Sequence, residues 1–242
     1  MIYLIDGTMD GIFTAVFNSY LTKKFPSALT DGEIQLEIGE ELVEVTTDLD
    51  KAQRVFNKLY KILPKRETDR IFTAIKSGDF AKFTVIFNYI VKTIDAGKNI
   101  YDKLSDKDVF NFDRLVSRVL LEAHRFKGFI RFSQAENGVY YAKYFPDSDI
   151  NTLILPHFVN RFKSMPFILH DLNHDVVSAH VDGMTKTVRE KVIPLDIKDD
   201  FAKLFKTYYD SIFIKERANE RLMNNYMPKR YHKYLPEKNE LL

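Results

Sequence analysis

The feature that most constrains the fold is the pair Asn137-Gly138, which lies between two segments of alternating apolar and polar residues, FIRFSQ and VYYAKYF. Asn-Gly in this setting is the strongest short-range signal of a β-hairpin, because both residues tolerate the left-handed backbone that tight hairpin turns need. A two-residue turn at this pair places Ser133 opposite Ala142 and Arg131 opposite Tyr144. The second half of the chain is therefore predicted to contain antiparallel sheet.

The alternation also predicts the faces of this hairpin, since successive side chains of a strand point to opposite sides. The predicted core face carries Ile130, Phe132, Val139, Tyr141 and Phe145, and the less apolar face carries Arg131, Ser133, Tyr140, Ala142 and Tyr144. A guanidinium between two tyrosine rings is a suitable platform for bases or phosphates. The alternative is that a helix covers this face and a carboxylate binds Arg131.

A second hairpin is predicted around Asn173-His174, between FILHDL and DVVSAHV. In that register His170 and His180 point to opposite faces, and His174 lies in the turn. A helix over residues 153–163 precedes this hairpin, with Pro156 expected in its first turn. A long helix over about 197–217 follows it and leads into a basic C-terminal strap, about residues 215–242.

The first half of the chain is predicted to be mostly helical. A short buried strand over residues 2–6 precedes a helix that Thr8 or Asp10 caps and that ends before Pro26. Alternation over 34–38 and 43–45 predicts a small hairpin. Four helices follow, and the last of them is expected to end in a left-handed cap at Gly128. The helices come first along the chain and the antiparallel sheet follows, and the sequence shows no repeat or linker. This order predicts a single α+β domain over residues 1–242.

The composition is that of a soluble globular protein, with 242 residues of which 45% are hydrophobic and 29% charged. The chain has no cysteine, which excludes disulfides and thiolate metal sites and fits a reducing compartment. The N-terminus lacks the pattern of a secretory signal, and the longest apolar run, FTVIFNYIV, is too short to span a membrane. We therefore expect a cytoplasmic protein that does not contact a membrane.

Charge is distributed unevenly along the chain although the net charge is only +2. Residues 31–50 contain eight acidic residues and no Lys or Arg, whereas residues 206–238 contain eight basic and four acidic residues. Such asymmetry indicates a polarised surface, one side of which attracts polyanions. The simpler interpretation is that both runs are solvated faces of helices and strands.

The basic C-terminal run also holds five tyrosines, Tyr208, Tyr209, Tyr226, Tyr231 and Tyr234. Cations beside flat aromatic rings suit a ligand with a charged backbone and stackable bases, which is nucleic acid. The same residues would also fit a terminal segment that is docked on the protein through Tyr231, Tyr234 and Leu235. Docking and binding are compatible, because a docked segment can still present its cations.

Motifs of catalysis are much weaker. The chain has no glycine-rich phosphate loop and no serine nucleophile elbow. The histidines do not converge as ligands in the predicted hairpin, so we expect no metal and no cofactor. Asp6, Glu122 and His124 are the candidate acid–base groups, although Asp6-Gly7 after a strand is more typical of a turn and helix cap.

Several separate segments resemble one bacterial family of unknown function that is associated with DNA metabolism or repair. They are YLIDGTMDGIFTAVFNSY, EAHRFKGFIRF with NGVYYAKYFPDSDIN, LPHFVNRF, and IKERANERLMNNYMPKRYHKYLPEK. The resemblance implies a partnership with a radical S-adenosylmethionine (radical SAM) protein, and some relatives are fused to a uracil-DNA glycosylase-like domain. The chain departs from the family pattern at His232, where a tryptophan is usual.

Our leading hypothesis from the sequence is a DNA-repair-associated protein that binds DNA, single- or double-stranded, together with a radical SAM or glycosylase-like partner. The candidate contacts are Arg125, Lys127, Arg131, Tyr140, Tyr144, Arg161, Lys215, Arg217, Arg221, Lys229, Arg230, Tyr231 and Lys233. Two alternatives stay open: an enzyme that acts on damaged nucleobases, and a protein adaptor that does not bind nucleic acid.

Overall fold

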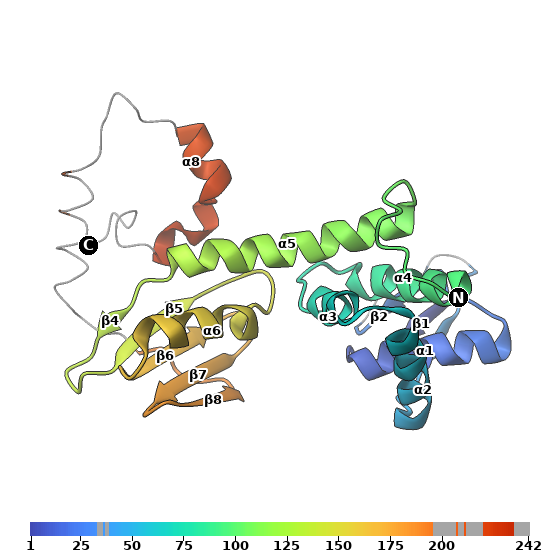
Figure 1. Ribbon diagram of the computed structural model, residues 1–242, viewed down its shortest axis with the longest axis horizontal. Helices are drawn as coiled ribbons and strands as arrows, with labels where there is room; N and C mark the ends of the chain where they lie inside the picture. Colours follow the sequence, from blue (N-terminus) through green and yellow to red (C-terminus); the bar gives the residue numbers. More distant parts are fainter. Residues whose placement is uncertain (33–35, 37–38, 196–206, 208–210, 212–219, 235–242) are drawn as a thin grey trace. The chain divides into compact units, whose positions relative to one another are not determined.

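The computed structural model of the chain describes residues 1–32, 36, 39–195, 207, 211 and 220–234. We predicted one domain, and the structure groups the chain into two compact units, Met1–Leu120 and Leu121–Leu242 (Figure 1). The first half is rich in helix and the second contains a mostly antiparallel sheet, which confirms the α+β class. Among the described residues no helix is long and apolar enough to cross a membrane.

The N-terminal unit is built on a small parallel sheet with β1 (Ile2–Leu4) in its centre. The strands β2 (Ala28–Thr30) and β3 (Leu42–Glu44) pair with β1 on either side, both in parallel. The strand predicted at residues 2–6 is therefore present. Of the small hairpin expected in the acidic block, the described arm is β3, which pairs with β1, while residues 33–35 and 37–38 lie outside the described residues.

Five helices complete this unit or begin in it: α1 (Met9–Thr22), α2 (Leu49–Ile62), α3 (Lys65–Ala74), α4 (Lys82–Ala96) and α5 (Lys107–Phe129). The predicted cap at Thr8 is confirmed, since its hydroxyl accepts from the Gly11 amide at 3.0 Å. Asp48 caps α2 in the same way and accepts from the amides of Asp50 and Lys51. Apolar side chains at helical spacing, such as Ile12, Phe13 and Val16, form the core with the sheet.

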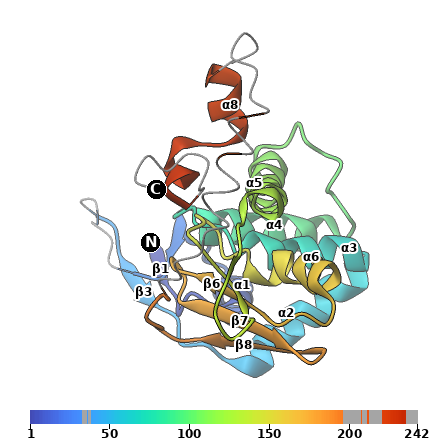
Figure 2. The same cartoon turned by 90° about the vertical axis from the view of Figure 1, so that its left-hand side faces the viewer.

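The C-terminal unit is a five-stranded sheet in the order β4-β5-β6-β7-β8. Its strands are β4 (Ser133–Gln134), β5 (Tyr140–Tyr144), β6 (Phe167–Asp171), β7 (Val176–Val181) and β8 (Met184–Arg189). All neighbours are antiparallel except β5 and β6, which α6 (Asn151–Phe162) connects as a crossover. The helix α6 lies against one face of β6 and β7 (Figures 1 and 2).

The first hairpin is present, but its register differs by one residue from the prediction. Ser133 pairs with Tyr141 rather than with Ala142. The Ala135 amide donates to the Val139 carbonyl at 2.9 Å, so the loop has three residues and ends in Gly138 with φ +82°. The predicted faces change accordingly: Tyr144 is buried at 1% exposure, and Phe145, expected in the core, is 42% exposed.

The second hairpin places His170 and His180 on opposite faces, as predicted, since Phe167 pairs with His180 and His170 with Val177. Its sheet continues into β8, which the sequence analysis did not anticipate. Pro156 lies inside α6 rather than in its first turn, because the helix begins at Asn151.

Two further corrections concern the ends of helices. Gly128 is not a left-handed cap, because α5 continues through Phe129. The helix α8 (Glu220–Tyr226) ends before Pro228 and the 3₁₀ helix η2 (Lys229–Tyr234) follows. The helix expected over 197–217 falls almost wholly outside the described residues.

Candidate nucleic-acid interface

A buried carboxylate, Glu122 of α5, organises the C-terminal unit around the predicted basic strap. One oxygen of Glu122 accepts from the Asp147 amide at 2.8 Å and the other from the Ser148 amide at 2.9 Å. The Tyr231 hydroxyl of η2 donates to the first of these oxygens at 2.7 Å. A carboxylate that accepts several hydrogen bonds is well satisfied when buried, so Glu122 links α5, the loop after β5 and the C-terminal segment.

The Tyr231 ring packs into an aromatic pocket on α5. Its centroid lies 4.8 Å from that of Phe126, edge to face, and 6.2 Å from that of Phe129. Tyr231 is only 3% exposed. The docking role that the sequence suggested for Tyr231 is therefore present, whereas the base-stacking role has no structural basis, because no ring face reaches the surface.

Tyr144 also belongs to the interior rather than to a binding platform. Its ring lies 5.5 Å from Phe126, and its hydroxyl accepts from the Asn151 side chain at 3.0 Å. Burial and the nearby negative charge of Asp171 raise the pKa of Tyr144 well above its ordinary value. Tyr140 is half-buried, with its ring 5.3 Å from Phe162. The platform of Arg131 between Tyr140 and Tyr144 is therefore not formed.

Two of the predicted arginines bind backbone carbonyls of their own unit. Arg131 lies just before β4, where its guanidinium donates to the Gly128 carbonyl at 2.6 Å, near the end of α5. Arg125 donates to the Asn225 carbonyl at 3.0 Å and so ties α8 to α5. Cations near the C-terminal ends of helices are favourable because they satisfy free carbonyls and the helix dipole. Arg125 and Arg131 therefore have structural roles.

Two cations and a histidine lie close together on α5 and α6, and we call them the α5–α6 basic cluster: Lys127, Arg161 and His157. His157 and Arg161 are four residues apart on α6 and share one face of that helix. Partial burial lowers the pKa of His157, and the positive charges of Lys127 and Arg161 lower it further. Lys127 and Arg161 form no ion pair or hydrogen bond with any described residue.

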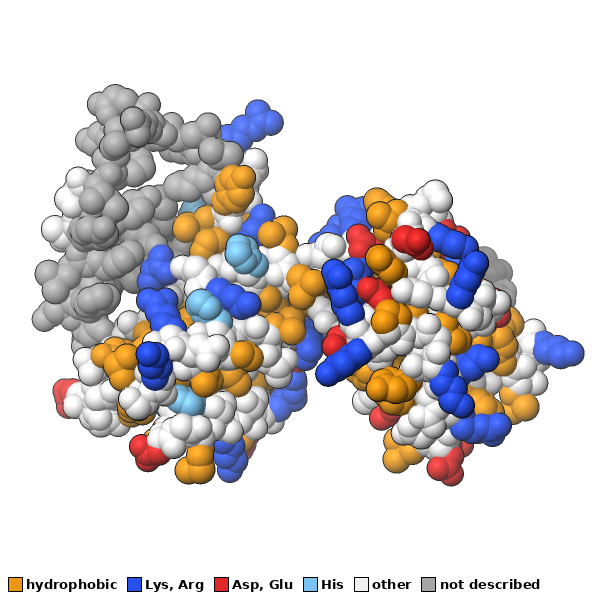
Figure 3. All heavy atoms as spheres, in the orientation of Figure 1, with side chains coloured by type: hydrophobic (Ala, Val, Ile, Leu, Met, Phe, Trp, Pro, Cys, Tyr) orange, Lys and Arg blue, Asp and Glu red, His pale blue; other side chains and the backbone are white. Residues whose placement is uncertain are grey.

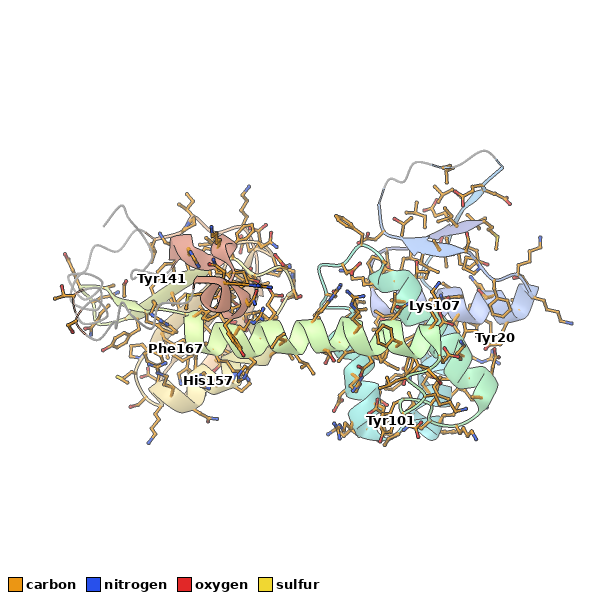
Figure 4. All side chains as sticks on the ribbon, turned by 90° about the horizontal axis from the view of Figure 1, so that it is seen from above. Tyr20, Tyr101, Lys107, Tyr141, His157 and Phe167 are labelled. Carbon is orange, nitrogen blue, oxygen red and sulfur yellow. The ribbon has the colours of Figure 1, made fainter. Side chains whose placement is uncertain are left out.

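The same face of the unit is positively charged more widely. In Figure 3, Lys, Arg and His side chains gather over α5 and α6, while Asp and Glu appear only towards the lower edge of this unit. Figure 4 labels His157 in the C-terminal unit. His157 was not among the predicted contacts, although its position four residues before Arg161 is a usable signal.

The remaining predicted contacts belong to the C-terminal segment. Arg221 of α8 and Lys229 of η2 are exposed, and neither has a partner among the described residues. Arg230 and Lys233 lie in η2, and their side chains are not among those described. Lys215 and Arg217 lie outside the described residues altogether.

The histidines of the second hairpin bind protein groups. His180 contacts the Thr185 hydroxyl and the Lys163 carbonyl, both at 2.8 Å, and His170 contacts the Tyr141 hydroxyl at 2.8 Å. His174 contacts the buried Asp171 at 2.9 Å. Within the described ranges no three His, Asp or Glu side chains are placed to hold a metal ion.

The candidate acid–base groups also have structural partners. Asp6, at the end of β1, accepts from the hydroxyls of Thr8 and Thr47, both at 2.7 Å. Partial burial opposes ionisation of Asp6, but these hydrogen bonds outweigh it and lower its pKa. Glu122 is the buried anchor described above. His124, two residues further along α5, is exposed.

Comparison with known proteins gives one result, which concerns the family. No curated protein and no solved structure matches the chain. A family model described as a domain of unknown function, DUF4130, matches residues 81–237. This range includes α4, α5 and the whole described part of the C-terminal unit, with Glu122, Tyr231 and the α5–α6 basic cluster. Because the match extends over more than half of the chain, the protein belongs to the DUF4130 family.

Proposed function

We propose that this protein acts in DNA metabolism or repair and binds nucleic acid through the positively charged face of its C-terminal unit. The observation that supports this most is the α5–α6 basic cluster, whose two cations, Lys127 and Arg161, lie close to His157 and have no carboxylate partner among the described residues. Unpaired like charges repel one another, so their grouping on packed helices is expected where an anionic ligand neutralises them.

The C-terminal segment extends this proposed surface. Tyr231 and Glu122 fix η2 against α5, and Lys229 of η2 and Arg221 of α8 are then presented to solvent. Arg125 and Arg131 hold α8 and the end of α5 in place. In this proposal the phosphate contacts come from Lys127, Arg161, Arg221 and Lys229. Lys215, Arg217, Arg230 and Lys233 remain candidates from the sequence alone.

Titration of labelled DNA, followed by fluorescence anisotropy at several salt concentrations, tests this function. The observed affinity should fall linearly with salt on a double-logarithmic plot, with a slope of about −0.9 per phosphate contact on duplex. The double variant Lys127→Ala with Arg161→Ala should reduce the slope by about 2. The matched control, Lys186→Ala with Lys191→Ala, removes two exposed lysines of the same unit and should bind like the wild type. Absence of binding to single or double strands even at low salt would exclude the proposal.

The partnership with a radical SAM or glycosylase-like protein rests on the sequence resemblance. Co-purification of the two proteins in the presence of nuclease measures direct contact without a nucleic-acid bridge. If the proteins remain together and the chain does not bind DNA, the adaptor hypothesis replaces nucleic-acid binding.

A further inference from the structure

A second basic segment lies in the N-terminal unit, before the part of the chain that the family model matches. Residues 51–66 contain six Lys and Arg residues and no Asp or Glu. They form most of α2 and the start of α3. This segment is independent of the C-terminal strap, because it belongs to the other compact unit.

Five of these cations lie along α2 and at the start of α3, and we call them the α2–α3 basic face: Arg54, Lys58, Lys61, Lys65 and Arg66. Arg54, Lys58 and Lys61 follow one another at intervals of four and three residues, so they form one stripe along α2. Lys65 and Arg66 open α3 directly after Pro64. All five are exposed.

Most cations of this face have no carboxylate partner among the described residues, although other cations of the same unit form ion pairs. Arg70 binds Asp113 and Glu67, and Lys92 binds Asp106 and Asp108 at 2.7 Å. By contrast, Lys58, Lys61, Lys65 and Arg66 have no ion-pair or hydrogen-bond partner among the described residues. Arg54 lies over the ring of Phe17 at 4.9 Å.

Helix stability does not explain the position of Lys65 and Arg66. They occupy the first turn of α3, where the positive end of the helix dipole makes a cation unfavourable. The N-cap residue Pro64 makes no side-chain hydrogen bond, and the acidic residue of the first turn, Glu67, is buried and pairs with Arg70. Positive charge at this point is therefore better explained by an anionic ligand than by folding.

Exposed aromatic rings lie on the same two helices as the cations. Tyr60 of α2 is 61% exposed and Phe72 of α3 is 39% exposed. The ring of Phe56 lies 6.1 Å from each of them, so the three form one cluster at the surface. Rings of this kind can stack on unpaired bases, which a duplex does not offer.

We propose that the α2–α3 basic face binds a single-stranded segment of nucleic acid, with its cations on the phosphates and Tyr60 and Phe72 against bases. This inference rests on the proposed function and adds a second contact surface and a strand preference to it. An anionic membrane fits less well, because a helix that inserts into a membrane needs an exposed apolar face. Ala52, Val55 and Leu59 of α2 are buried in the core, and its exposed apolar residues, Leu49 and Tyr60, lie near opposite ends of the helix and form no continuous apolar face.

The test uses the full chain and a fluorescent single-stranded oligonucleotide, titrated at several salt concentrations. The triple variant Lys58→Ala, Lys61→Ala and Lys65→Ala should reduce the salt slope by about 2, at about 0.7 per contact on a single strand. The matched control, Lys24→Ala, Lys98→Ala and Lys103→Ala, removes three exposed lysines of the same unit. It should leave the slope unchanged. Tyr60→Ala should weaken single-strand binding roughly 5- to 150-fold, with little effect on duplex.

The possible failures are distinguishable. If the wild type binds no nucleic acid, the proposed function fails and this inference fails with it. If the Lys127 and Arg161 double variant weakens binding while the triple variant equals its control, only this inference is overturned. If the triple variant loses binding to phosphatidylserine vesicles and keeps its affinity for DNA, the face is a membrane contact and the inference is also overturned. Circular dichroism of every variant confirms that the fold is intact.

Discussion

At the scale of single residues, the buried contacts of Glu122 and Tyr231 determine how the C-terminal unit presents its cations. Tyr231 is 109 positions from Glu122 in the sequence, yet their side chains meet at 2.7 Å. The contact fixes η2, and with it Lys229, against α5. No local pattern reveals such a pair, because its members are brought together only by the folded chain.

Tyr231→Phe should lower the free energy of unfolding by about 2 kcal/mol, the cost of removing a buried hydrogen bond to a charged group. Glu122 keeps its two backbone donors in this variant, and the aromatic packing is unchanged. The control Tyr226→Phe alters a side chain that is 67% exposed and should change stability by less than about 0.5 kcal/mol. Urea unfolding measures both, and equal losses would contradict the anchoring role of Tyr231.

His174 gives the C-terminal unit a pH-dependent contribution to stability. Burial of the imidazole lowers the pKa of His174, but the hydrogen bond to Asp171 and the charges of Asp171 and Asp149 outweigh it. Arg189, on the neighbouring strand, opposes them. The net pKa in the folded state is raised above 6.5, so this contribution is full below about pH 6.5 and is lost as the pH rises through the raised value.

The unfolding free energy of the wild type, compared with that of His174→Asn, should therefore show a difference that shrinks as the pH increases from 6 to 8.5. The substitution removes the titrating group and keeps a residue that is tolerated in turns. A difference that stays constant or grows with pH would show that the Asp171 contact does not favour the protonated form.

At the scale of elements, the sequence predicted the existence of helices and hairpins better than their exact pairing. Asn137-Gly138 located the first hairpin, but the loop has three residues rather than two, which moved Tyr144 inwards and Phe145 outwards. The pair Asp182-Gly183, with φ values of 50° and 75°, joins β7 to β8 and is an equally strong hairpin signal in the sequence. The parallel pairing of β5 with β6 depends on the α6 crossover, which alternation alone does not specify.

The two glycines at element ends should respond oppositely to alanine. Gly138 has φ +82°, which an L side chain adopts only with strain, so Gly138→Ala should destabilise by about 1 kcal/mol or more. Gly128 lies inside α5, and Gly128→Ala should stabilise by roughly 0.5–1 kcal/mol. A Cβ at either position meets no atom within 4 Å, so backbone conformation alone determines the sign. Thermal unfolding measures both, and equal signs would argue against the conformations described.

At the scale of the whole molecule, the net charge is only +2 because basic and acidic residues nearly cancel, although they are concentrated in two separate cationic surfaces and an acidic block. The α5–α6 basic cluster belongs to the C-terminal unit and the α2–α3 basic face to the N-terminal unit. The basic tail was predicted from its charge, whereas the basic segment over residues 51–66 was not, although its six Lys and Arg residues without an acidic residue were a usable signal. In both proposals, helix geometry rather than total charge creates the binding surface.

Two surfaces on one chain predict a dependence on the length of the bound strand. A longer strand offers more binding positions, which alone raises its affinity in proportion to their number. A second contact made by the same strand is intramolecular, so the affinity should rise well beyond this proportion once a strand reaches both surfaces. Wild-type protein titrated with single strands of about 8 to about 40 nucleotides should show this rise. The Lys58, Lys61 and Lys65 triple variant and the Lys127 and Arg161 double variant should each lose it and retain the weaker affinity of one surface. A wild-type affinity that grows only in proportion to the number of available positions would mean that the two surfaces do not engage the same strand.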